Sequence, residues 1–118
     1  MNSLRRFGGT MHDPYVAVDS ILMPWAQAHG FPVTTRYRDD IVRSIWFCDE
    51  HGNQRAQMWL GISKPLNTVS VFVGEFRPDL PGKWGECLHR EAAISELGDT
   101  LNEFSKAALR WAGPGAFT

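Results

Sequence analysis

Two cysteine–histidine pairs are the residues of this chain whose types and spacing could support metal binding or nucleophilic catalysis. Cys48 lies three residues before His51, and Cys87 lies two residues before His89. Two thiolates and two imidazoles together form the ligand set of a tetrahedral zinc site. However, these spacings match no standard zinc finger, and both pairs would have to meet at the same end of a sheet. We therefore expect no metal, and a zinc site or small enzyme built on these four residues is the alternative.

No other catalytic pattern stands out. A cysteine nucleophile needs an oriented imidazole and a glycine-rich oxyanion turn, and the sequence around Cys87 contains neither. The acidic neighbours Asp49 and Glu50 fall in a predicted turn, where solvation gives no reason for a shifted pKa. The glycine pairs lack the strand–loop–helix context of a phosphate-binding loop. We expect no cofactor, and a binding protein rather than an enzyme.

Length and composition restrict the class of protein. The chain has 118 residues, of which 43% are hydrophobic and 21% charged, with a formal net charge of −1. These values predict one globular domain and exclude a disordered chain. The near-neutral charge argues against nucleic acid as the partner, and no apolar run reaches the roughly 20 residues of a membrane helix. Two cysteines and no secretory signal favour a cytoplasmic protein with free thiols.

The elements that would position these residues follow from periodicity. Residues 1–12 are expected to form a flexible leader, residues 13–113 the domain and residues 114–118 a flexible tail; either Met1 or Met11 could be the natural start. A helix is predicted from Pro14 to His29, closed by Gly30, with a kink or early end at Pro24. A second helix is predicted from the apolar stripe that begins at Ile94, Leu97 and Leu101 and ends before Gly113.

Four strands are predicted between the helices, over residues 33–38, 41–48, 54–62 and 69–76, because β-branched and aromatic residues alternate there. Short turns between them imply antiparallel neighbours. A loop is predicted over residues 77–85, which places Cys87 and His89 near the start of the last helix. The expected fold is a two-layer α+β sandwich of order α-β-β-β-β-α. It contains a four-stranded antiparallel meander sheet with both helices on one face.

The face of the sheet opposite the helices is expected to carry large aromatic residues. In each strand, the alternate positions with mainly aliphatic side chains are expected to face the helices. Trp59, Phe72 and Phe76 then face outward. In the strand over residues 41–48 the register stays open, so either Trp46 or Phe47 faces outward. Arginines are the expected neighbours of these rings, namely Arg36, Arg38, Arg43 and Arg55. Trp59, Phe72 and Phe76, with Trp46 and Arg55, are the predicted binding residues.

A sheet face rich in aromatic and arginine residues has the composition of a protein-binding hot spot. A large apolar patch on a soluble domain usually meets a partner. Three occupants are open: a different partner or ligand, a second copy in a homodimer, or a segment of the same chain, either residues 77–85 or the leader. In architecture alone, such a domain resembles small bacterial immunity proteins, which neutralise a toxin domain, and secretion chaperones, which hold an effector. This resemblance carries over no residue.

Overall fold

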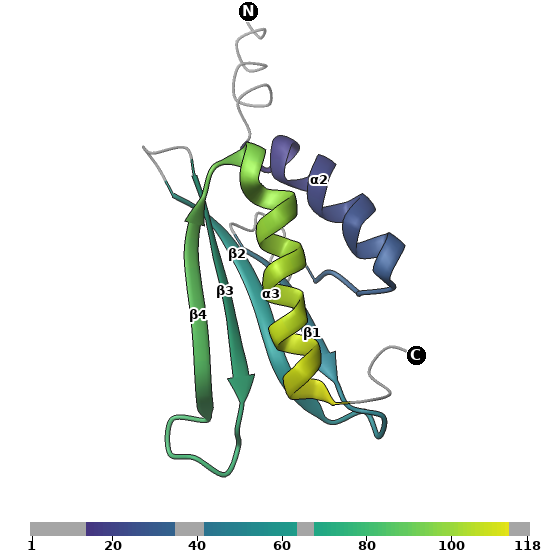
Figure 1. Ribbon diagram of the computed structural model, residues 1–118, viewed down its shortest axis with the longest axis vertical. Helices are drawn as coiled ribbons and strands as arrows, with labels where there is room; N and C mark the ends of the chain where they lie inside the picture. The colour runs from purple at the N-terminus through teal and green to yellow at the C-terminus, as the bar shows by residue number, and fades with distance from the viewer. Residues whose placement is uncertain (1–13, 35–41, 64–67, 114–118) are drawn as a thin grey trace, which may run out of the picture.

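The computed structural model describes residues 14–34, 42–63 and 68–113. The chain order is helix, four strands and helix, as predicted, and a short 3-10 turn precedes the last helix. The elements are α2 (Pro14–His29), β1 (Val42–Cys48), β2 (Gln54–Ser63), β3 (Thr68–Phe76), β4 (Trp84–Ala92), η1 (Ile94–Glu96) and α3 (Leu97–Ala112). The strands form an antiparallel sheet of order β1-β2-β3-β4, and both helices lie on one face of it (Figure 1). The α+β sandwich is therefore confirmed. Within the described ranges, no helix is long and apolar enough to cross a membrane.

The strand at one edge of the sheet differs from the prediction. In the segment predicted as a strand over residues 33–38, Thr34 forms an isolated antiparallel bridge with Ser44; residues 35–38 lie outside the described residues. The fourth strand is instead β4, which covers the end of the loop predicted over residues 77–85 and the residues just before the helical stripe that begins at Ile94. Its sequence has charged residues at both alternate sets of positions and does not alternate apolar with polar residues, so it lacks the periodicity that identifies a half-buried strand.

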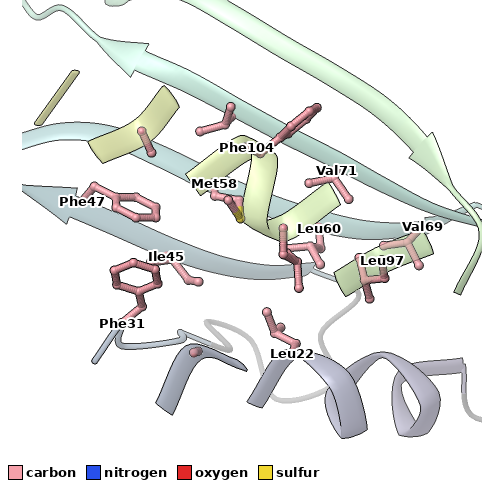
Figure 2. Packing of buried hydrophobic residues seen from close by; sticks show 14 of the residues in the cluster. Leu22, Phe31, Ile45, Phe47, Met58, Leu60, Val69, Val71, Leu97 and Phe104 are labelled. Carbon is pink, nitrogen blue, oxygen red and sulfur yellow. The ribbon is translucent and has the colours of Figure 1, made fainter. Parts of the chain in front are cut away.

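The core lies between the sheet and the two helices. The inward side chains of the central strands are fully buried, among them Met58, Leu60 and Val71, and Figure 2 shows them together with Phe104 of α3. Leu101 of α3 belongs to the same buried cluster. Phe47 on β1 has no exposed surface, which settles the open register of this strand. Because successive strand residues point to opposite faces, Trp46 points away from the helices.

An ion pair attaches α2 to the first strand. Arg43 donates two hydrogen bonds of 3.1 Å to the Asp19 carboxylate, and its guanidinium lies 4.1 Å from the centre of the Tyr15 ring. Arg43 pairs with the buried Leu60 and shares its face, so the expectation that Arg43 lies beside the outward rings is wrong. The helix itself continues past Pro24 to His29, and Gly30 follows with a φ of 75°.

Candidate protein-binding face

Five aromatic side chains lie together on the face of the sheet opposite the helices. We call this set the aromatic cluster; it consists of Trp46, Trp59, Phe72, Phe76 and Trp84. Every strand contributes at least one ring, and each ring is partly exposed. Trp59, Phe72 and Phe76 were predicted to face outward, and Trp46 was one of two alternatives for its strand; the structure brings all four together. Antiparallel pairing places their Cβ atoms opposite or diagonal to one another, so the rings contact across strands.

Two members of the cluster, Trp59 and Phe72, form a stack with His89 that runs across three strands. Trp59 on β2 pairs with Phe72 on β3, which pairs with His89 on β4. The Trp59 and Phe72 ring centres are 5.3 Å apart at an interplanar angle of 12°, and those of Phe72 and His89 are 4.2 Å apart at 14°. Cross-strand stacking of this kind fixes the ring orientations, so the face is preorganised.

Trp84 is the member of the cluster that sequence analysis missed. Gly74 pairs with Cys87 and Phe76 pairs with Trp84, so β4 has one extra residue between them. This bulge turns Trp84 to the face that Cys87 occupies. Its ring lies over Gly74, where an added Cβ would come within 3.1 Å of both the Trp84 ring and the Cys87 sulfur. The sequence signal was a glycine inside a strand, which marks a close approach by another group.

The indole N–H groups of the cluster differ from those elsewhere in the molecule. Trp25 donates to Asn102 at 2.8 Å, and Trp111 donates to Glu86 at 3.3 Å. In the described part of the chain, the indole N–H groups of Trp46, Trp59 and Trp84 have no protein acceptor. Buried tryptophans usually satisfy this donor, and interface tryptophans offer it to a partner.

Arg55 lies at the hairpin end of the sheet. It is the extra residue of a bulge in β2, and its guanidinium donates to the Asp49 carboxylate at 3.0 Å. The backbone N–H of Asn53 is the main cause that lowers the pKa of Asp49 far below its ordinary value, and Arg55 and the His51 N–H lower it further. The expectation that a carboxyl group in this turn has an unshifted pKa is therefore wrong for Asp49, because backbone N–H groups of the turn donate to its carboxylate.

Charged groups at both ends of the outer face are paired within the protein. At the hairpin end Arg55 binds Asp49, and at the other end the His89 ring lies 3.0 Å from the Glu91 carboxylate. Glu91 also accepts hydrogen bonds from Thr68 and Ser70. The face is thus an apolar centre with polar, internally paired ends, which is the arrangement of a core and rim in protein interfaces.

The cysteine–histidine pairs are not brought together. Cys48 ends β1 and Cys87 lies in β4, and these strands form the two opposite edges of the sheet. Three interstrand steps separate them, or about 14 Å. His51 lies in the β1–β2 turn, and His89 is stacked on Phe72. Among the residues that the structure describes, no three His, Cys, Asp or Glu side chains are grouped so that they could hold a metal ion.

Comparisons of the chain with protein-family models, with curated proteins and with solved structures found no match.

Proposed function

We propose that this protein is a non-catalytic binding module that recognises another protein through the outer face of its sheet. The observation that carries the proposal is the aromatic cluster, with three indole donors that no described residue accepts. Tryptophan is enriched among the residues that dominate binding energy, because it combines a large apolar area with a hydrogen-bond donor. The anchors are Trp59, Phe72 and Trp84, with Trp46 and Phe76 beside them.

The chemistry of the face defines the partner that it fits. The ring edges and the unpaired indole donors suit an apolar surface with exposed carbonyl or carboxamide oxygens. Because Arg55 and Glu91 already have partners within the chain, the face does not depend on a strongly charged ligand. These properties support a protein partner such as a toxin or secreted effector domain, in the manner of an immunity protein or a secretion chaperone.

The proposal is tested by comparing capture of partner proteins by variants of the outer face. Tagged wild-type protein, Trp59→Ala and Phe72→Glu are immobilised in parallel, and retained proteins are identified by mass spectrometry and then purified for binding assays. We expect both variants to bind the partner at least about tenfold more weakly, because truncating an aromatic hot-spot residue costs roughly 2 kcal/mol or more of binding free energy.

A matched control comes from the opposite side of the molecule. Val16 on α2 is 61% exposed, so Val16→Ala removes an exposed apolar group without touching the outer face. Its binding should equal that of the wild type. Circular dichroism and urea unfolding establish that each variant is folded. Equal binding by folded Trp59→Ala, Phe72→Glu and wild-type proteins would refute the proposal, and loss of the fold in both variants would identify these rings as core residues instead.

A further inference from the structure

β4 is an edge strand with an unusual set of side chains. Within the described residues it pairs with β3 alone, and Figure 1 shows it at the edge of the sheet remote from α2. Its other edge therefore presents main-chain N–H and C=O groups to solvent. Natural sheets usually protect such an edge with charged residues, because the free groups pair readily with another strand. β4 has three charged residues, namely Glu86, Arg90 and Glu91, and the first two lie at equal distances from Leu88 in the sequence.

Two of the three charged residues of β4, Glu86 and Arg90, are arranged symmetrically about Leu88. Glu86 lies two residues before Leu88 and Arg90 lies two residues after it, and all three belong to the helix-side face of the strand. Leu88 is 40% exposed, one of few large apolar side chains in the described residues with that much exposure. In an antiparallel pair of two identical strands centred on Leu88, each Glu86 lies opposite Arg90 of the second copy, and the two leucines meet at the twofold axis.

Other registers of the same pairing are less favourable. Centring on Glu86 or on Arg90 places like charges directly opposite each other, which is destabilising. Centring on Cys87 or His89 leaves Leu88 opposite a charged residue, Glu86 or Arg90. The Leu88-centred register pairs the segment from Glu86 to Arg90 with itself, and the bulge next to Trp84 lies outside this segment. Charge pairing and apolar pairing therefore select the same register.

We infer that β4 is a dimerisation edge, and that its partner is β4 of a second copy of this chain. The residues from Glu86 to Arg90 alone would contribute about four to six main-chain hydrogen bonds across the twofold axis. Arg90 already binds Glu103 at 2.8 and 3.0 Å, which holds its guanidinium on the helix side, where Glu86 of the second copy would lie. The bulge between Trp84 and Cys87 lies at the end of this paired segment and does not interrupt its centre.

Dimerisation through this edge leaves the outer face free. A twofold axis perpendicular to the sheet places the helices of both copies on one side and both aromatic clusters on the other. The result is a continuous eight-stranded sheet in which two recognition faces lie side by side. This inference does not depend on the proposed function, since the residues that form the edge contacts are not those of the aromatic cluster.

The first test measures the solution mass of the full chain by light scattering coupled to size-exclusion chromatography. The wild type should have a mass of 26.6 kDa, twice the 13.3 kDa of one chain. Glu86→Lys and Arg90→Glu should each be monomeric at the same concentration, because each places two like-charged pairs across the axis. Trp59→Ala should stay dimeric, which separates this inference from the proposed function.

Mixing the two charge variants tests the register. One chain then has two positive charges at positions 86 and 90 and the other has two negative charges, so both cross-strand pairs become complementary. The mixture should form a heterodimer, although neither variant dimerises alone. Recovery on mixing also demonstrates that each variant is folded.

A cross-link at the axis gives a second, independent measurement. Leu88→Cys in a Cys48→Ser, Cys87→Ser background places two thiols opposite each other within disulfide distance. A mild thiol oxidant should convert most of this protein to a covalent dimer, whereas Val16→Cys in the same background should stay largely monomeric. A monomeric wild type, a dimer that survives both charge variants, or a dimer that Trp59→Ala disrupts would each overturn the inference.

Discussion

The two faces of the sheet are both apolar, but they differ in how their side chains are satisfied. On the helix side, Leu60 and Val71 have no exposed surface and contact aliphatic groups of the helices. On the outer side, Trp59 and Phe72 are partly exposed and stack on each other. The first set stabilises the fold because its side chains are completely buried. The second set gains only partial burial from its neighbours, so its residue types need a further explanation.

The tryptophans sharpen this difference. Trp25 and Trp111, which belong to the helices, both donate hydrogen bonds within the protein. In the described residues, the three tryptophans of the outer face donate none to the protein. A residue selected only for packing needs no unsatisfied donor, and leucine or phenylalanine would serve as well. The contrast therefore favours recognition as the reason for these residues.

The largest expected difference between the faces is in stability. Leu60 and Trp59 are adjacent residues of β2 that point to opposite faces, which makes them a matched pair. Leu60→Ala should lower the free energy of unfolding by about 2–5 kcal/mol, because it opens a cavity in the core. Trp59→Ala should lower it by only about 1–2 kcal/mol, mainly through lost stacking with Phe72. Urea unfolding measures both, and a larger loss for Trp59→Ala would reverse our assignment of the two faces.

The two arginines on either side of the sheet provide the next comparison. The Arg43 side chain is 12% exposed and binds Asp19 on the helix side, whereas that of Arg55 is 45% exposed. Arg43→Ala should cost about 1.5–3 kcal/mol of unfolding free energy, since it removes hydrogen bonds to a charged group. Arg55→Ala should cost less, because solvent screens its ion pair. Equal losses in thermal or urea unfolding would contradict the difference in environment.

A smaller effect on stability is expected at Gly74, where the absence of a side chain leaves room for the Trp84 ring. Gly74→Ala adds a methyl group 3.1 Å from the Trp84 ring, so the ring must shift. We expect a loss of about 1–2 kcal/mol, comparable to mild overpacking, and a change in tryptophan fluorescence. Gly98→Ala is the control, because nothing lies within 4 Å of its added methyl group. That helix substitution should stabilise the protein by roughly 0.5–1 kcal/mol and leave the fluorescence unchanged.

The smallest expected effect concerns pH at the hairpin end of the outer face. The pKa of Asp49 is far below its ordinary value because its carboxylate accepts the Asn53 N–H and binds Arg55. A lowered folded-state pKa contributes stability above the ordinary value of 3.8, and that contribution is lost as the pH falls below it. Unfolding stability should therefore fall from about pH 5 to pH 2. Asp49→Asn should flatten this slope, and an unchanged slope would show that other carboxyls dominate.

The fold was largely predictable because its strongest signals are local. The apolar stripe of α3 and the alternating residues of β2 and β3 define the two layers without any tertiary information. β4 was not predictable in this way, because an edge strand buries little and its sequence does not alternate apolar with polar residues. The sequence leaves the register of β1 open, because both alternate sets of positions in that strand contain large apolar residues. The burial of Phe47 in the structure decides it.

The candidate site was predictable only in part. Trp59, Phe72 and Phe76 follow from strand parity alone, but Trp84 reaches the cluster through a bulge, which no periodicity reveals. Arg43 was placed on the outer face because a charged side chain is usually exposed to solvent. Its inward position depends on the ion pair with Asp19 of α2, which the sequence of the strand does not reveal. Whether the cysteine–histidine pairs come together depends on the order of the strands in the sheet. The sheet places Cys48 and Cys87 at opposite edges.

The most direct test follows the indole N–H resonances of the five tryptophans by nuclear magnetic resonance as the partner recovered by capture is added. The account predicts that the signals of Trp46, Trp59 and Trp84 shift or broaden, whereas those of Trp25 and Trp111 stay in place. Shifts confined to Trp25 and Trp111 would place the binding surface on the helices and contradict the account.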